Sequence, residues 1–271
     1  MIEQKRIIVG QEEIFYLFKP SARPVATLVF IHGFPFSSAI WTSQLQSLPE
    51  NIEGIAYDIG GFGQSSAAHH FFSVDLFARN LNLLLDALKL EKVILCGLSM
   101  GGYISLRFAQ IYSEKLAGLI LCDTNSVADT DESKLKRFAS IDLVSSGKKD
   151  EFISGFLNNI FAELSFERNT EAVKHVEGIM QHTAAETICA AQLALASRTD
   201  TGATLSQLEV PALIVRGEHD KVMTNEHASI LQEGIINSEK VIIPGSGHMS
   251  NLENESVFNG FLLNFLSKHF F

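Results

Sequence analysis

The segment VILCGLSMGGYISLRFA, residues 93–109, decides the fold of this chain. It begins with an apolar run rich in β-branched residues, passes through Gly97-Leu98-Ser99-Met100-Gly101, and continues with apolar residues at helical spacing. We therefore predict a buried strand that turns sharply into a helix at Ser99. The two glycines leave room where side chains would collide, and a strained backbone exposes the serine hydroxyl. This pattern is typical of a nucleophilic serine, and the alternative is an ordinary serine in a glycine-rich turn.

Two backbone amides are candidates to stabilise an oxyanion beside Ser99. The predicted helix starts at Met100, whose N–H group has no partner within the helix and can face a developing negative charge. A second donor is expected from the loop after the third predicted strand, which reads HGFPFSS. In that loop the N–H of Phe34 is the natural donor, and the His32 side chain is expected to stabilise the loop.

A serine nucleophile needs a base, and the base needs an orienting acid. His248 lies in PGSGHMS, a glycine-rich loop after the last predicted strand, and is predicted to be the general base, with a structural loop histidine as the alternative. Two aspartates follow buried strands, Asp220 and Asp123. Asp220 gives the chain order serine, aspartate, histidine and is preferred as the acid. Asp123 remains the alternative acid. If it is not the acid, its side chain is expected to cap the segment that follows it.

The rest of the chain alternates short apolar runs with helical patterns. RIIV and EIFYLF flank a glycine and predict a hairpin. Further buried strands are predicted at 26–33, 54–58, 92–97, 118–123, 212–217 and 240–244, and helices at 73–90 and 255–270. This alternation predicts a mostly parallel sheet covered by helices on both faces.

One region interrupts the alternation. Residues 125–205 hold no convincing buried strand and have a polar, helical pattern, so we predict a helical insertion. The core is then expected at residues 1–124 and 206–271. Phenylalanines recur in the insertion, and three are candidates to line an apolar substrate pocket, with helix packing as the alternative: Phe138, Phe156 and Phe161.

Composition excludes several classes of protein. The net charge of −10 argues against a general nucleic-acid binder. The three cysteines form no C-x-x-C motif, so neither a disulfide framework nor a zinc site is indicated. No apolar run reaches the ~18 residues that a membrane helix needs, and the first ten residues lack a signal-peptide core, which makes the cytoplasm the expected location. His69 and His70 lie in polar surroundings and are expected to be solvated.

Taken together, these motifs resemble the α/β-hydrolase superfamily: His-Gly at 32–33, Asp58-x-x-Gly-x-Gly-x-Ser, the glycine-flanked Ser99, Gly-x-x-Asp at 217–220 and Gly-His at 247–248. Within it, HGFPFSSAIW and CDTNSVADTDESKLKR resemble the branch of 3-oxoadipate enol-lactonases, cofactor-free haloperoxidases and carboxylesterases. The resemblance implies an eight-stranded, mostly parallel α/β sheet with a helical cap. It also implies a catalytic triad of Ser99, Asp220 and His248, with the Phe34 and Met100 amides as oxyanion donors. Dehalogenases and epoxide hydrolases use an aspartate nucleophile, so Ser99 argues against both.

The activity implied is hydrolysis of a small carboxylic ester or lactone through an acyl-enzyme, with neither metal nor organic cofactor, by a monomer or homodimer. No nucleic-acid or membrane partner is expected. The same triad also supports carbon–carbon bond hydrolysis, hydroxynitrile cleavage, perhydrolysis or acyl transfer to an alcohol. A non-catalytic receptor for small ligands on the same fold is a further alternative, and it is disfavoured because no triad residue is missing.

Overall fold

A computed structural model of the chain describes residues 1–68 and 71–271, so His69 and His70 lie outside the described residues. Its centre is one eight-stranded sheet in the order β1-β2-β4-β3-β5-β6-β7-β8. The β1–β2 and β2–β4 pairs are antiparallel, and all pairs from β4 to β8 are parallel. The predicted fold class is therefore confirmed.

Each predicted apolar run forms a strand. The strands are β1 Glu3–Val9, β2 Glu12–Lys19, β3 Ala26–Ile31, β4 Ile52–Tyr57, β5 Val93–Leu98, β6 Leu116–Cys122, β7 Ala212–Gly217 and β8 Ser238–Ile243. Strand β5 is buried along its whole length, as a central parallel strand must be. The predicted hairpin forms, although β1 begins three residues before the apolar run, because its first residues are polar and solvent-facing at the edge of the sheet.

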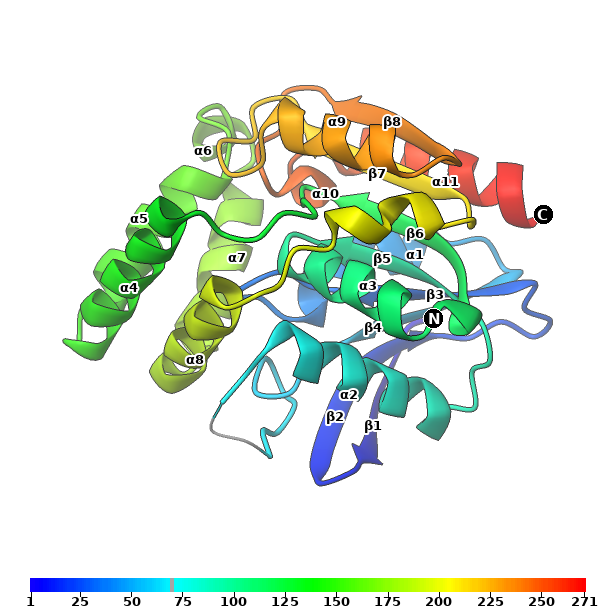
Figure 1. The fold of residues 1–271 in the computed structure, drawn as a ribbon, viewed down its shortest axis with the longest axis horizontal. Helices are drawn as coiled ribbons and strands as arrows, with labels where there is room; N and C mark the ends of the chain where they lie inside the picture. The colour runs from blue at the N-terminus through cyan, green and yellow to red at the C-terminus, as the bar shows by residue number, and fades with distance from the viewer. Residues whose placement is uncertain (69–70) are drawn as a thin grey trace.

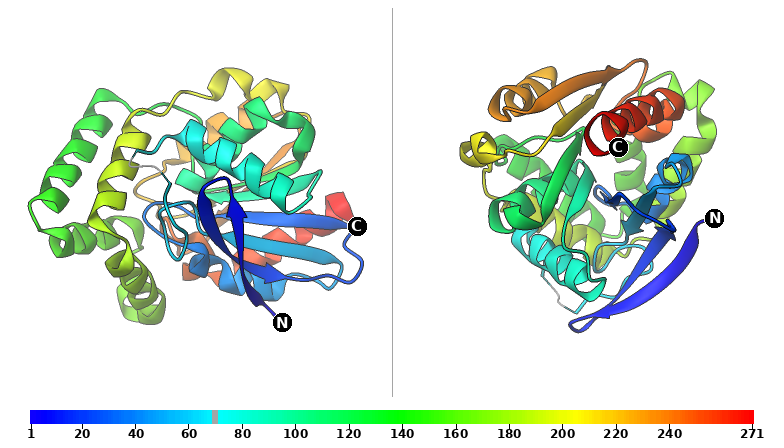
Figure 2. Two further views of the ribbon diagram at one scale, coloured as in Figure 1. Left: turned by 90° about the horizontal axis from the view of Figure 1, so that it is seen from below. Right: turned by 90° about the vertical axis from the view of Figure 1, so that its right-hand side faces the viewer.

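Helices cover both faces of the sheet (Figures 1 and 2). The α2, α3 and α9 helices lie on one face, and α1 and α11 lie on the other. Their bounds are α1 Thr42–Ser47, α2 Val74–Ala87, α3 Met100–Ile111, α9 Asn225–Gly234, α10 Ser250–Glu253 and α11 Glu255–Phe270, with short 3₁₀ helices η1 Ser38–Trp41, η2 Ser113–Lys115 and η3 Gly202–Gln207. Helix α2 begins where its cap predicts, because the Ser73 hydroxyl accepts a hydrogen bond from the N–H of Leu76.

Five further helices follow β6 and precede β7. They are α4 Asp131–Ser145, α5 Lys149–Ile160, α6 Ser165–Arg168, α7 Thr170–His182 and α8 Ala185–Ala196. We call α4–α8 the helical insertion. It lies to one side of the sheet, on the left in Figure 1, beyond the ends of the parallel strands. A buried ion-pair network fastens both of its ends, because Asp129 pairs with Arg137 and Arg198, and the Arg198 guanidinium lies 4.2 Å from the centre of the Tyr103 ring.

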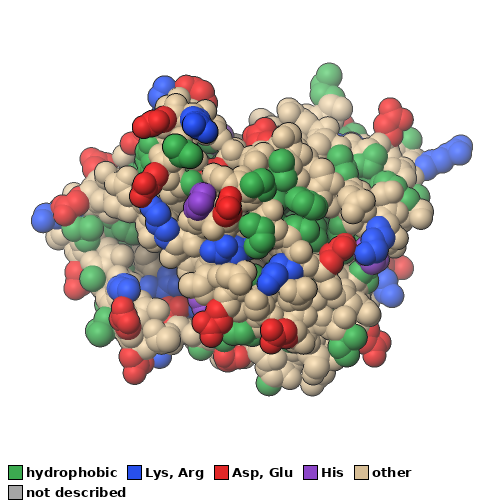
Figure 3. Space-filling model, turned by 90° about the horizontal axis from the view of Figure 1, so that it is seen from above, with side chains coloured by type: hydrophobic (Ala, Val, Ile, Leu, Met, Phe, Trp, Pro, Cys, Tyr) green, Lys and Arg blue, Asp and Glu red, His purple; other side chains and the backbone are tan. Residues whose placement is uncertain are grey.

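The surface carries mixed charge. On the face shown in Figure 3, acidic and basic side chains are interspersed. Among the described residues, no helix combines the length and the apolar character that a membrane crossing requires. Cys96 and Cys122 are buried in the core with their sulfur atoms 3.9 Å apart.

Candidate active site

Ser99 occupies a strained turn between β5 and α3. Its φ of 52° and ψ of −112° lie in a region that non-glycine residues rarely adopt. The strain is held by the backbone: the N–H of Ser99 donates to the carbonyl of Cys122 at 2.9 Å, and its carbonyl accepts from Gly102 N at 2.9 Å and from the Thr124 hydroxyl at 2.8 Å. Ser99 is partly exposed, whereas its neighbours Leu98 and Met100 are buried.

Steric contacts explain why positions 97 and 101 of the motif are glycines. A Cβ on Gly97 would lie 2.3 Å from the carbonyl oxygen of Gly101, and a Cβ on Gly101 would lie 2.2 Å from that of Ile31. Neither position has room for a side chain without movement of the backbone. The predicted reason for glycines two residues before and after Ser99 is therefore confirmed.

His248 and Asp220 come together from two separate loops. His248 Nδ1 lies 2.9 Å from Asp220 Oδ2, and both side chains are buried. The other carboxylate oxygen of Asp220 accepts from the amides of Val222 at 2.7 Å and Met223 at 2.9 Å, which fixes the carboxylate. Because Nδ1 donates to Asp220, the neutral ring leaves Nε2 as a proton acceptor. No hydrogen bond joins the Ser99 hydroxyl to His248 among the described residues.

The surroundings of His248 favour its protonated form. Burial by itself lowers the pKa of His248, but the charge and hydrogen bond of Asp220 outweigh it, together with the charges of Asp123 and Glu253, and the pKa is raised above its usual value. Burial alone raises the pKa of Asp220. The charge of His248 and the hydrogen bonds to the carboxylate outweigh burial, so the pKa of Asp220 is lowered. Each of the two groups therefore stabilises the charged form of the other.

Asp123, the alternative acid, has other partners. Its carboxylate accepts from the amide of Gly217 at 2.7 Å and from the Ser250 hydroxyl. No hydrogen bond joins Asp123 to His248 in the part of the chain that the structure describes. Burial, followed by the charge of Asp220, raises the pKa of Asp123 well above its usual value. Asp123 therefore links the ends of β6 and β7 to the loop of His248.

The loop after β3 lies against Ser99. A Cβ on Gly33 would lie 3.3 Å from the Cβ of Ser99, so the chain passes close to the turn at Ser99. The N–H groups of Phe34 and Met100 have no hydrogen-bond partner among the described residues. His32 supports the loop as predicted: its Nδ1 lies 2.9 Å from the carbonyl of Gly33, and its Nε2 accepts from the amide of Ile59 at 3.0 Å.

The candidate pocket phenylalanines occupy different environments. Phe156 of α5 packs edge-on against Phe34, with ring centres 5.7 Å apart, and Phe152 packs on the same ring at 6.3 Å. Phe161 is fully buried and contacts Phe166, and Phe138 is 44% exposed on α4. Of the three predicted residues, Phe156 is therefore the one whose ring adjoins the loop of Phe34.

Two polar residues of the site were not predicted. The Thr124 hydroxyl donates to the carbonyl of Ser99. Its position directly after a predicted buried strand could have marked Thr124 as a residue of the site. Glu253 binds the amides on either side of His248, at Gly247 and Met249. Nothing in the local sequence pattern marks Glu253, because its donors are three backbone amides and one hydroxyl that is distant in the sequence.

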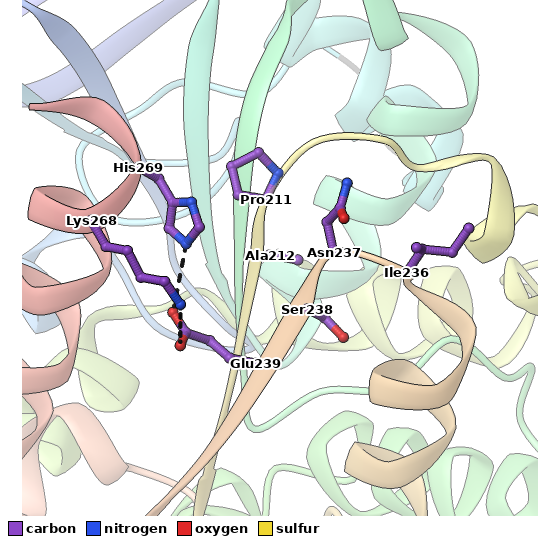
Figure 4. A pocket seen from close by; sticks show the side chains of 8 residues that line it. All are labelled: Pro211, Ala212, Ile236, Asn237, Ser238, Glu239, Lys268 and His269. Carbon is purple, nitrogen blue, oxygen red and sulfur yellow. Dashed lines mark hydrogen bonds and ion pairs between the residues drawn. The ribbon is translucent and has the colours of Figure 1, made fainter.

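A hollow of about 500 Å³ lies elsewhere, where β7 and β8 begin (Figure 4). In it, Glu239 forms an ion pair with Lys268 at 3.3 Å, and His269 Nε2 lies 3.8 Å from Glu239 Oε1. The candidate catalytic side chains follow the opposite ends of the parallel strands, so this hollow is separate from them. No group of three or more histidine, cysteine, aspartate or glutamate side chains among the described residues is arranged to hold a metal ion.

Known proteins match most of this chain. A non-heme chloroperoxidase of Kitasatospora aureofaciens is 31% identical, over 94% of this chain and 96% of that protein. The 3-oxoadipate enol-lactonase 2 of Acinetobacter baylyi is 26% identical, over 89% of this chain and 88% of the other. The structure of a thermophilic esterase from Thermogutta terrifontis superposes with a TM-score of 0.91 at 27% identity, covering 99% of this chain and 100% of that one.

A family described as the alpha/beta hydrolase fold matches residues 26–255. That range begins at β3, ends after the loop of His248, and includes every strand of the parallel part of the sheet. It also includes the helical insertion and all the candidate catalytic residues. On this match, the chain belongs to the α/β-hydrolase fold family.

Proposed function

We propose that this α/β hydrolase is a serine esterase or lactonase, in which Ser99 attacks the carbonyl of a small carboxylic ester or lactone and forms an acyl-enzyme. The observation that carries the proposal is the 2.9 Å bond between His248 Nδ1 and Asp220 Oδ2. It orients the imidazole and leaves Nε2 free to take the serine proton. The similarity to an enol-lactonase and an esterase supports this class of substrate.

The reaction follows from these roles. His248 takes the proton of the Ser99 hydroxyl as its oxygen attacks the carbonyl, and the N–H groups of Phe34 and Met100 bind the oxyanion. His248 then gives the proton to the leaving alcohol, which stays tethered when the substrate is a lactone. Water then attacks the acyl carbon while His248 takes its proton. His248 returns that proton to the Ser99 oxygen as the bond to the acyl group breaks, and the carboxylic acid released ionises in water. Loss of one oxyanion donor costs about 3 kcal/mol in other serine enzymes.

In this proposal residues 125–205 act as a cap over the site, and residues 1–124 and 206–271 form the core. Two contacts between the cap and the catalytic loops support this division. Phe156 packs against Phe34, and the N–H of His248 donates to the carbonyl of Ile160 at 2.7 Å. The cap therefore supplies an apolar wall beside the oxyanion loop.

The first experiment measures turnover of p-nitrophenyl acetate and butyrate, together with labelling by a fluorophosphonate read by peptide mass spectrometry. We expect turnover by the wild-type protein and an adduct on Ser99. Ser99→Ala should lower turnover about 10⁴-fold or more and abolish the adduct. Ser113→Ala removes an exposed serine in η2 and is the matched control, expected to behave as wild type.

The pH profile is the second readout of the same experiment. Because the pKa of His248 is raised, activity should fall as the pH drops through a value above the ~6.5 of an ordinary histidine. A rate that does not change between about pH 5 and pH 8 would exclude His248 as the base. Adduct formation on a serine other than Ser99 would contradict the proposed nucleophile.

Perhydrolysis is the second candidate, and the similarity to a non-heme chloroperoxidase favours it. In that reaction hydrogen peroxide, in place of water, attacks the acyl-enzyme and yields a peroxy acid and free Ser99. Product analysis with acetate esters in the presence of peroxide distinguishes the two. Peroxy acid that depends on Ser99 would establish perhydrolysis, whereas acetate alone would leave hydrolysis.

A further inference from the structure

Glu253, at the end of α10, joins the loop of His248 to the helical insertion through both oxygens of one carboxylate. Its Oε1 accepts from the amides of Gly247 at 2.8 Å and Met249 at 3.1 Å. Its Oε2 accepts from the amide of Ala162 at 2.8 Å and from the hydroxyl of Ser165 at 2.6 Å. Four donors from two distant parts of the chain therefore converge on one side chain.

The contact between these two segments is close enough to fix their relative position. The N–H of His248 donates to the carbonyl of Ile160 at 2.7 Å. A Cβ on Gly247 would lie 2.6 Å from the amide nitrogen of Ala162, so the two backbones touch directly. The residues on both sides of His248 are thus held by Glu253, and the amide of His248 itself is held by the insertion.

We propose that Glu253 is a positioning residue for His248, which sets the place of the base by clamping its loop to the junction of α5 and α6. This inference rests on the proposed role of His248. Glu253 touches neither the imidazole nor, in the mechanism above, the substrate. It acts through the backbone of residues 247 and 249, and its charge adds to the field at the ring.

The carboxylates that act on the His248 ring come from three elements. Asp220 follows β7 and binds Nδ1, Asp123 follows β6, and Glu253 lies on α10. All three raise the pKa of His248, so removal of the Glu253 charge lowers it. A residue that served only to stabilise the fold would not change the pH at which the base titrates.

Glu253→Gln is the main variant. Each carboxylate oxygen accepts two donors, and the amide NH₂ of glutamine cannot accept from either pair. We expect kcat to fall about 10- to 100-fold with little change in KM, and the acid limb of kcat/KM to move to lower pH. Glu255→Gln is the matched control, because Glu255 lies two residues on and accepts from the Ser43 hydroxyl.

Two further variants separate geometry from charge. Glu253→Asp keeps the charge on a side chain one methylene shorter, so kcat should fall while the acid limb stays near the wild-type pH. Ser165→Ala removes one donor from the insertion, so kcat should fall less than in Glu253→Gln, with the acid limb unchanged. If Glu253→Gln does not fold, these two variants decide the question.

The outcomes are distinct from those of the proposed function. Two results would overturn the role of Glu253. One is a folded Glu253→Gln variant with the kcat and the acid limb of wild type. The other is wild-type kcat in both Glu253→Asp and Ser165→Ala. Either result leaves the hydrolase proposal intact, because Ser99→Ala and the fluorophosphonate adduct decide that proposal in the wild-type background. Full activity of His248→Ala would overturn both.

Discussion

Two glycines near the ends of the parallel strands, Gly101 and Gly217, have surroundings opposite to those of Gly155 in the helical insertion. A Cβ on Gly101 would lie 2.2 Å from the carbonyl oxygen of Ile31, and one on Gly217 would lie 1.9 Å from that of Gly247. A Cβ on Gly155, in α5, would meet no atom within 4 Å. Close backbone contacts therefore require glycine at positions 101 and 217, whereas position 155 has room for a side chain.

This difference separates two contributions to the proposed activity. At the strand ends, backbone contacts hold Ser99 and His248 in place, so changes there should affect all substrates alike. In the insertion, side chains such as Phe156 form a wall beside the oxyanion loop, so changes there should alter the ratio of rates between substrates. The predictions below test this separation.

The largest effect is expected for Asp220→Asn. The variant removes the charge that holds the Nδ1 proton of His248 and favours the wrong tautomer, which costs about 10⁴-fold in kcat in a serine protease with the same triad. We expect a loss of this order on acetate and butyrate esters alike. Asp123→Asn is the matched comparison and should cost far less, because Asp123 binds Gly217 and Ser250. The reverse order of the two effects would make Asp123 the orienting acid.

A smaller effect on stability is expected for alanine at two of the compared glycines. Gly101→Ala forces a methyl group into the backbone of β3 and should lower the free energy of unfolding by about 3 kcal/mol. Gly155→Ala places the same methyl group in open space within a helix and should raise it by about 0.5–1 kcal/mol. Urea unfolding measures both, and equal effects at the two positions would remove the distinction between the regions.

The sequence predicted best what depends on neighbours in the chain. The turn at Ser99 follows from an apolar run, flanking glycines and a helical pattern, all within residues 93–109. His248 and Asp220 follow strand ends, and a parallel sheet brings such positions together whatever the loop conformations are.

Contacts of the insertion could not be predicted in the same way. Helical spacing shows which residues share a face, but not which face lies toward the core. Phe138 was accordingly grouped with Phe156, although the structure leaves it 44% exposed. Glu253 was missed because its partners Ala162 and Ser165 lie far away in the sequence, and two of its other donors are backbone amides.

The smallest effect is expected for Phe156→Ala, which tests the insertion side of the comparison. Loss of the ring opens space beside Phe34 and leaves the triad in place, so long acyl esters should gain kcat/KM over acetate by about 10-fold. The Phe138→Ala variant is the matched control, and its ratio of rates should equal that of wild type. The measurement is kcat/KM for a series of p-nitrophenyl esters. A shift with Phe138→Ala but none with Phe156→Ala would place the acyl group against α4. A fall of equal size on every ester with Phe156→Ala would instead mean that α5 positions the oxyanion loop, and selectivity would then have to come from other residues.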